Sequence, residues 1–95
     1  MKTGTKISGQ ATVLYLQRDE SSTHARFGFI VSKAVAGAIG RNLVKRRLRS
    51  IAREILQAHP AGFNVVIRAL PEANEFEWNR LHQEVLSNVK AALNK

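Results

Sequence analysis

The sequence predicts an α/β (α+β) two-layer sandwich, in which a small mixed sheet packs against two helices in the order β-β-α-β-α. Residues 11–17 and 26–32 show the alternation of side chains that is typical of half-buried strands. Residues 38–58 and 75–94 carry apolar side chains at the spacing of amphipathic helices. The chain has 95 residues, no cysteine and 44% hydrophobic residues, so it suits one core without disulfides.

The N-terminal segment, residues 1–10, is polar and contains glycine. We expect it to be loose or to form a short edge strand near residues 5–8. Residues 11–95 contain no repeat, linker or low-complexity segment, which predicts a single domain there.

Two strands follow, and we expect them to pair as antiparallel neighbours through the polar turn between them. Alternation assigns one side of each strand to the core, for example Leu14 in residues 11–17 and Phe29 in residues 26–32. The side chains that alternation turns to the other side include Val13, Tyr15, Ile30 and Ser32.

The second half of the chain begins with a helix over residues 38–58, which the sequence HPAG at residues 59–62 ends. The apolar, β-branched run of residues 63–69 predicts a buried strand. A proline interrupts the chain, and residues 75–94 then form the second helix. Trp78 is expected in the core, because a single tryptophan on an amphipathic helix usually packs inward.

The first helix carries the most informative stretch of the chain. Residues 41–53 contain six positive charges and no negative one, beside an apolar stripe that faces the core. At about 100° per residue, the polar side chains gather on an arc roughly 140° wide. They are Arg41, Asn42, Lys45, Arg46, Arg49 and Arg53. Like charges four residues apart repel by a few tenths of a kcal/mol per pair, so the arc predicts an anionic partner such as a row of phosphates.

The charge of the whole chain points the same way. Lys and Arg number 15 against 7 Asp and Glu, which gives a formal net charge of +8. Such a balance favours nucleic acid, an anionic membrane surface or an acidic partner. A membrane-surface helix would carry bulky apolar residues opposite its charges, whereas this one has a narrow aliphatic stripe. The chain shows no signal sequence and no apolar span, so we expect a cytoplasmic protein that binds nucleic acid and no membrane.

Two nearby segments form a combined motif. Residues 26–33 read RFGFIVSK, and residues 41–49 read RNLVKRRLR. A strand end of the form Gly-x-x-Val-Ser-Lys, followed after a short loop by Arg-Asn-x-x-Lys-Arg, strongly resembles the protein subunit of bacterial ribonuclease P. The resemblance covers roughly residues 11–94, and the strand motif, the helix motif and their spacing together make it specific.

The resemblance implies a subunit of an endoribonuclease that removes the 5′ leader from precursor tRNA. The catalytic RNA subunit, which holds most of the Mg²⁺, is implied to hydrolyse the phosphodiester bond, so we expect no catalytic residue and no metal ligand in the protein. A protein monomer is expected to join one RNA. The family fold also implies a left-handed β-α-β crossover, against the usual preference.

The residues that match the family's binding positions fall into two groups. Contacts to the catalytic RNA are expected from the helix and the loop before it, at Arg41, Asn42, Lys45, Arg46, Arg49, Arg53 and Lys33. Contacts to the single-stranded leader are expected in a cleft beside the sheet, at Val13, Tyr15, Ile30 and Ser32. Among these, Tyr15 supplies an aromatic ring on which a base can stack.

The sequence departs from the family pattern at three places. Only residues 1–10 precede the first long strand, so the long helix that usually begins the family is expected to be missing. This predicts a more open cleft and weaker leader binding. Leu43 and Ala34 each stand where the family commonly has a basic residue, and each removes a charge that could meet RNA.

Two other functions stay open. A stand-alone RNA-binding or ribosome-associated protein of similar fold would share the basic arc but take no part in cleavage. A basic nuclease that acts alone would need carboxylates around a metal ion or a positioned acid–base pair. The seven acids show no such arrangement, and His24, His59 and His82 match no metal-ligand spacing.

Overall fold

The computed structural model describes residues 4–94, and its elements follow the predicted order. They are β1 (Gly4–Ser8), β2 (Thr12–Arg18), β3 (Arg26–Ile30), α1 (Ala38–Ala58), β4 (Phe63–Ala69), the 3₁₀ helix η1 (Pro71–Asn74) and α2 (Trp78–Leu93). The predicted α+β class is confirmed, and the short strand expected near residues 5–8 is β1.

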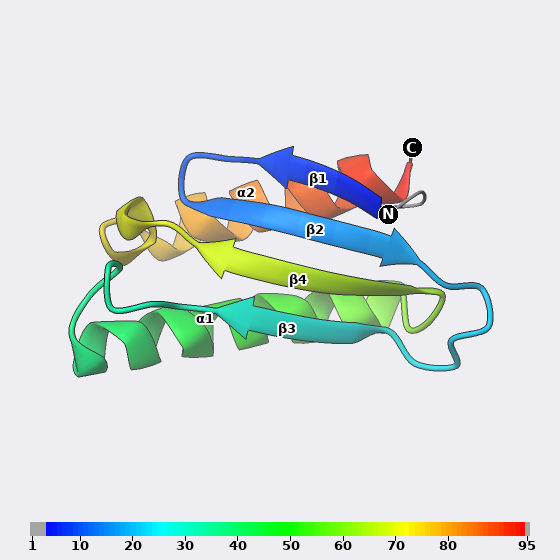
Figure 1. Cartoon of the computed structure of the whole chain (residues 1–95), viewed down its shortest axis with the longest axis horizontal. Coiled ribbons are helices and arrows are strands. Elements are labelled where there is room, and N and C mark those ends of the chain that lie inside the picture. Colours follow the sequence, from blue (N-terminus) through cyan, green and yellow to red (C-terminus); the bar gives the residue numbers. More distant parts are fainter. Residues whose placement is uncertain (1–3, 95) are drawn as a thin grey trace.

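The strands form one mixed sheet in the order β1-β2-β4-β3 (Figure 1). β2 is antiparallel to both β1 and β4, and β3 is parallel to β4. The expected pairing of β2 with β3 is therefore wrong, because β4 lies between them. Phe63, Val65 and Ile67 make β4 the most apolar strand, which suits a central position, whereas alternation identifies the faces of a strand and not its neighbours.

β3, α1 and β4 form a crossover between two adjacent parallel strands. In Figure 1 both strands point to the left, β4 lies above β3, and α1 runs behind the sheet. A connection with this geometry is left-handed, against the preference of most such crossovers. The hand was expected from the family resemblance alone, since no periodicity in the sequence reports it.

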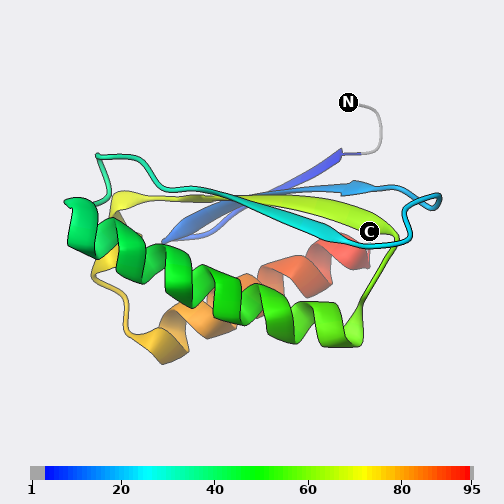
Figure 2. The ribbon, with the colours of Figure 1, turned by 90° about the horizontal axis from the view of Figure 1, so that it is seen from below.

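Both helices cover the same face of the sheet and leave the opposite face bare (Figure 2). Between the two layers lies the hydrophobic core. Its largest fully buried side chains include Phe63, Leu14, Leu16, Leu48, Ile51, Ile67 and Leu81. Because the apolar stripes of both helices are used in this core, the functional surfaces must lie on the outer side of α1 and on the bare face of the sheet.

Two close contacts position the connections between elements. Glu84 on α2 accepts hydrogen bonds from the backbone N–H groups of Gln10 and Ala11, so the turn between β1 and β2 is fixed to α2. In the first turn of α1, a Cβ on Gly40 would lie 2.6 Å from the Cβ of Ala36. Glycine therefore lets the chain from β3 pass close to the start of α1.

The structure differs from the prediction at two element boundaries and at one residue that was expected in the core. β3 ends at Ile30 instead of residue 32, because the chain turns at Ser32, whose carbonyl accepts a hydrogen bond from the N–H of Val35. α2 begins at Trp78 instead of residue 75, because Glu75 ends η1 and the N-cap residue Glu77 has an extended backbone. The expectation of a core Trp78 is wrong: the side chain is 38% exposed, and Leu81 fills the core position of that turn.

Candidate nucleic-acid interface

The basic residues of α1 gather along one exposed side of the helix. Five side chains line a shallow hollow of about 470 Å³ there, namely Ile39, Asn42, Lys45, Arg46 and Arg49. Their spacing of three or four residues stacks them on successive turns. Arg53 continues the row by one more turn and is exposed. We call Asn42, Lys45, Arg46, Arg49 and Arg53 the basic row.

The basic row has no acidic partner within the part of the chain that the structure describes. The salt bridge found there joins His82 to Glu54, between α2 and α1. The repulsion between successive charges of the row is therefore not relieved inside the protein. A surface of this kind concentrates a polyanion, and Arg and Lys side chains meet its phosphates directly.

Two other arginines of α1 are engaged within the protein. Arg47 Nη1 donates a hydrogen bond to the carbonyl of Phe76 at 3.0 Å, which ties α1 to the segment before α2. Arg41 Nη1 donates to the carbonyl of Ala36 at 3.1 Å, which ties the helix start to its entry loop. Arg41 was expected to contact RNA, and its guanidinium has five N–H donors, so this bond leaves others for a phosphate.

The bare face of the sheet carries three ranks of side chains that cross all four strands. Residues paired across the strands share a rank, and neighbouring ranks lie two residues, or about 7 Å, apart along each strand. The ranks are Ser8–Val13–Arg68–Ile30, Lys6–Tyr15–Val66–Gly28 and Gly4–Gln17–Asn64–Arg26. These positions include three basic residues and no acidic one, so the face is positively charged.

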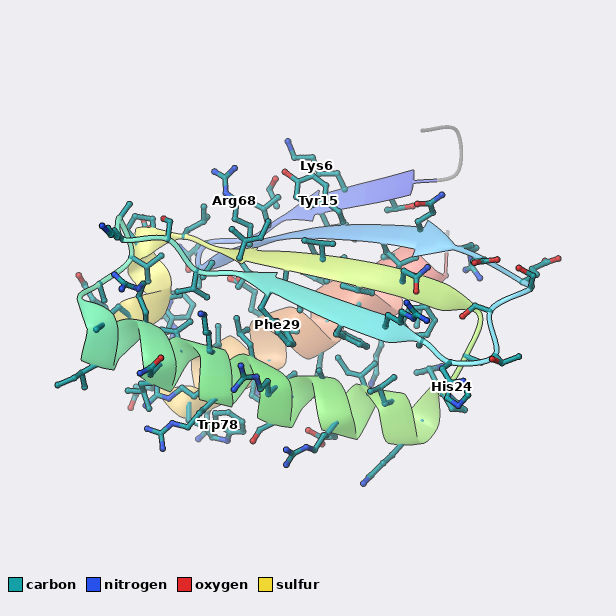
Figure 3. All side chains as sticks on the ribbon, turned by 60° about the horizontal axis from the view of Figure 1, so that its bottom comes forward. Lys6, Tyr15, His24, Phe29, Arg68 and Trp78 are labelled. Carbon is teal, nitrogen blue, oxygen red and sulfur yellow. The ribbon has the colours of Figure 1, made fainter. Side chains whose placement is uncertain are left out.

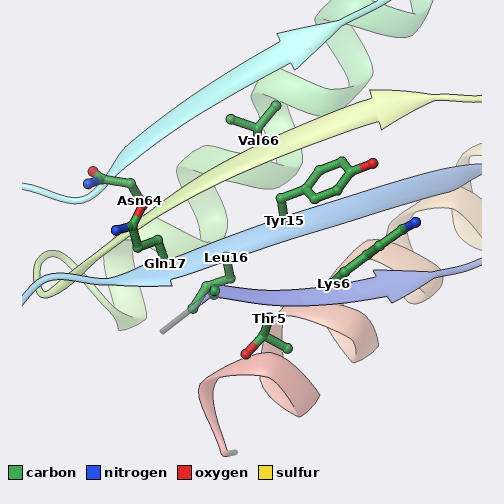
Figure 4. A pocket seen from close by; sticks show the side chains of 8 residues that line it. Thr5, Lys6, Tyr15, Leu16, Gln17, Asn64 and Val66 are labelled. Carbon is green, nitrogen blue, oxygen red and sulfur yellow. The ribbon is translucent and has the colours of Figure 1, made fainter. Parts of the chain in front are cut away.

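A hollow of about 310 Å³ lies over the middle of the bare face, as Figure 4 shows. Tyr15 and Val66 form its apolar floor, and Gln17 and Asn64 place two amide groups at one end. Lys6 extends from β1, with Nζ 5.9 Å from the centre of the Tyr15 ring. An exposed ring beside a cation is the combination that binds single-stranded nucleic acid, through base stacking and phosphate contact. We call this the central hollow.

The residues predicted on the sheet side do not all offer the same surface. Tyr15 and Ile30 lie on the bare face and are 39% and 50% exposed. Val13 shares that face but is only 9% exposed, so little of it can touch a ligand. Ser32 and Lys33 lie beyond the end of β3, in the loop that leads to α1, and both are exposed. The loop that contains these two residues joins β3, which contributes to the bare face, to α1, which carries the basic row.

Sequence reasoning missed four residues of the bare face, namely Lys6, Asn64, Val66 and Arg68. The run from 63 to 69 was interpreted as buried because most of it is apolar, yet only its odd positions face the core. Asn64 and Arg68, both at even positions, were the available signal of a second, solvent-facing side. Figure 3 shows Lys6, Tyr15 and Arg68 projecting from the side of the sheet away from the helices.

Metal ligands do not cluster in the described structure. Within residues 4–94, no group of three or more His, Asp or Glu side chains is placed to hold a metal ion. His24 lies in the loop after β2, His59 caps the end of α1, and His82 stacks against Trp78 on α2. No helix among these residues has the length and apolar character to cross a membrane.

Comparison with known proteins gives consistent matches. Residues 1–93 match the family described as Ribonuclease P. The ribonuclease P protein component of Pseudarthrobacter chlorophenolicus is 36% identical over 95 residues, which cover 100% of this chain and 70% of that protein. The corresponding protein of Kocuria rhizophila is 39% identical over 87 residues, which cover 92% and 77%. The structure of the Staphylococcus aureus RNase P protein has the same fold, with a TM-score of 0.81 at 23% identity over 96% of this chain and 83% of that one.

Proposed function

Since the chain belongs to the bacterial ribonuclease P protein family, as a protein subunit of that tRNA-processing ribonuclease, we propose that it binds RNA through two separate surfaces. The basic row of α1 binds the catalytic RNA, and the bare face of the sheet binds the 5′ leader of precursor tRNA. The observation that supports this proposal is that the chain carries two exposed basic surfaces with different shapes, one along α1 and one on the bare face of the sheet.

The basic row suits a folded RNA because its charges are fixed on a rigid helix. Lys45, Arg46 and Arg49 surround one hollow, so they can contact neighbouring phosphates of a single RNA segment. Asn42 lies among them and has both donor and acceptor groups, which lets it contact a base or a ribose. Arg53 and Lys33 extend the charged surface at its two ends.

The bare face suits a single strand because it combines stacking with charge. A leader base stacks on Tyr15, and neighbouring nucleotides pack against Val66 and Ile30. Lys6 and Arg68 project from the same face and contact the phosphates. The contacts are to a ring face and to phosphates, so this surface tolerates leaders of different sequence.

In this proposal the RNA subunit catalyses the hydrolysis, and the Mg²⁺ ions are bound mainly by the RNA. The described residues offer no cluster of ligands that fits a metal ion, so we assign no step to a protein-bound one. The protein binds and orients the substrate as a monomer in a 1:1 ribonucleoprotein of the cytoplasm.

Reconstitution tests the proposal. The chain is combined with a bacterial ribonuclease P RNA and assayed on precursor tRNA at a low Mg²⁺ concentration, at which the RNA alone cleaves poorly. Restored cleavage at the mature 5′ end is the expected result. Tight, salt-sensitive RNA binding without restored cleavage would favour the stand-alone RNA-binding protein instead. Absence of RNA binding would refute both functions.

A further inference from the structure

The most exposed large hydrophobic side chain of the described residues lies at the start of α1. Ile39 is 87% exposed, whereas the next such residue, Ile30, is 50% exposed. The first turn of α1 lies at one end of the molecule, and Ile39 takes no part in the hydrophobic core (Figure 2). Helix formation does not explain the residue either, because β-branched side chains lower helix propensity. The helix therefore presents an apolar group to solvent where neither the core nor the helix itself requires one.

Ile39 lies on the same side of α1 as the basic row. It lines the hollow of about 470 Å³ together with Asn42, Lys45, Arg46 and Arg49. At about 100° and about 1.5 Å per residue, Ile39 and Arg46 differ by only about 20° around the helix axis and lie about 10 Å apart along it. Asn42 lies between them, about one turn from each. An RNA that binds the basic row must therefore cover Ile39 as well.

The surroundings of Ile39 indicate which part of an RNA covers it. Three of the other side chains that line the hollow are positively charged and none is acidic, so the ligand there is anionic. An aliphatic side chain gains nothing from a phosphate and packs instead against a base or a ribose.

Paired and unpaired nucleotides differ in what they offer to such a side chain. In an A-form duplex the faces of the bases are stacked on one another, and the major groove is too deep and narrow for side chains to enter. An unpaired nucleotide exposes the face of its base. Asn42 places amide donors and an acceptor one turn from Ile39, and these suit the hydrogen-bonding edge of the same base.

We propose, on the basis of the function proposed above, that Ile39 and Asn42 form a subsite for one unpaired nucleotide of the catalytic RNA. Ile39 packs against the face of the base, Asn42 forms hydrogen bonds with its edge, and Arg46 contacts a neighbouring phosphate. The contact of Ile39 contributes affinity that depends little on salt, in contrast to the charges of the basic row. The subsite consequently selects an RNA with an unpaired base over a duplex.

The test measures the affinity of three variants and the unmodified protein for two RNAs over a range of salt concentrations. The RNAs are a bacterial ribonuclease P RNA and a fully paired RNA duplex. The variants are Ile39→Ala, Ile39→Leu, which keeps an apolar side chain of the same size, and Lys45→Ala, which removes one charge of the basic row. Because Ile39 is so exposed, both of its variants should have the urea midpoint of the unmodified protein.

We expect Ile39→Ala to weaken binding of the catalytic RNA about four- to fifteenfold at every salt concentration, the effect of losing one or two buried methylene-sized groups. The slope of log affinity against log salt should stay unchanged, because no phosphate contact is lost. Binding of the duplex should also stay unchanged. Ile39→Leu should bind both RNAs nearly as the unmodified protein does, whereas Lys45→Ala should reduce the slope for both.

A double-mutant cycle tests whether Ile39 and Asn42 contact the same nucleotide. If they do, combining Ile39→Ala with Asn42→Ala should weaken binding of the catalytic RNA by less than the product of the two single effects. Effects that multiply fully would place the two side chains on different nucleotides and overturn the proposed subsite.

The remaining outcomes separate a failure of the subsite from a failure of the proposed function. Unchanged binding by Ile39→Ala, together with a reduced slope for Lys45→Ala, would overturn the subsite and leave the basic row as the surface that binds the catalytic RNA. Equal weakening for the catalytic RNA and the duplex would also overturn it, since the duplex has no unpaired base. If Lys45→Ala too binds both RNAs with unchanged affinity and slope, the proposed function of the basic row fails, and the subsite fails with it.

Discussion

Tyr15 and Val66 lie directly opposite each other on β2 and β4, and each side chain is 39% exposed. Both point to the face of the sheet that the helices leave bare. An aromatic ring and a branched aliphatic side chain at the centre of a sheet normally attract a covering layer. Several of the neighbouring side chains, among them Lys6, Asn64 and Arg68, are basic or amide groups, so the expected cover is a nucleic-acid strand and not a second layer of protein.

The ring of Tyr15 is therefore expected to contribute directly to leader binding. Tyr15→Ala should weaken the binding of precursor tRNA to the reconstituted enzyme by about 1–3 kcal/mol, because a stacked base loses its partner. Affinity for mature tRNA, which has no leader, should not change. Tyr15→Phe keeps the ring and should bind almost as the unmodified protein does. A Phe variant as weak as the Ala variant would assign the effect to the hydroxyl and contradict stacking.

How much of this structure the sequence predicts depends on the kind of sequence pattern that is used. Helical spacing reports a face directly, so the positions of Lys45, Arg46 and Arg49 beside one another could be predicted. Alternation along a strand also distinguishes its two faces, so Tyr15 and Ile30 could be assigned to the face that points away from the core. Their roles in RNA binding stay predictions.

Neighbours in the sheet follow from long-range packing, which no local pattern encodes. That is why the predicted pairing of β2 with β3 is wrong. The bare-face residues of β4 are missed for a different, local reason. Asn64 and Arg68 become visible only when the strand is examined for alternation, and not only for how many of its residues are apolar. The left-handed crossover lies outside local patterns altogether, and only the family resemblance predicted it.

The basic row predicts a specific change in salt dependence. Lys45→Ala should lower the affinity for the catalytic RNA and reduce the slope of log affinity against log salt by about 0.7 to 0.9, because one phosphate contact is lost. The measurement is filter binding to the RNA over a range of salt concentrations. Lys90→Ala removes an exposed positive charge on α2, outside the basic row, so it serves as the matched control and should leave the slope unchanged. Equal slopes for all three proteins would show that RNA binds elsewhere.

The core side of the same helix should behave differently. Leu48 is fully buried between α1 and the sheet, so Leu48→Ala should lower the free energy of unfolding by about 2–5 kcal/mol through the cavity that it creates. Leu48→Met conserves volume and should cost less than about 1.5 kcal/mol. Urea denaturation measures both. At concentrations where the variants remain folded, their RNA affinity should match that of the unmodified protein, since Leu48 does not reach the basic row.

Glu84 gives a prediction about how the N-terminal hairpin is held. Its carboxylate accepts hydrogen bonds from the N–H of Gln10 at 2.9 Å and from Thr12 Oγ1 at 2.7 Å, and it also receives the N–H of Ala11. Glu84→Ala leaves these donors without their partner, and we expect a loss of about 1–3 kcal/mol in the free energy of unfolding.

A double-mutant cycle tests whether this loss comes from the hydrogen bonds. Thr12→Val removes one donor, so combining it with Glu84→Ala should cost less than the sum of the two single changes. Lys6 lies on β1 of this hairpin, and hydrogen exchange of the β1 amides should therefore rise in Glu84→Ala. Simple additivity of the two changes, with unaltered exchange in β1, would show that α2 does not anchor the hairpin and that Lys6 is positioned by the β1–β2 ladder alone.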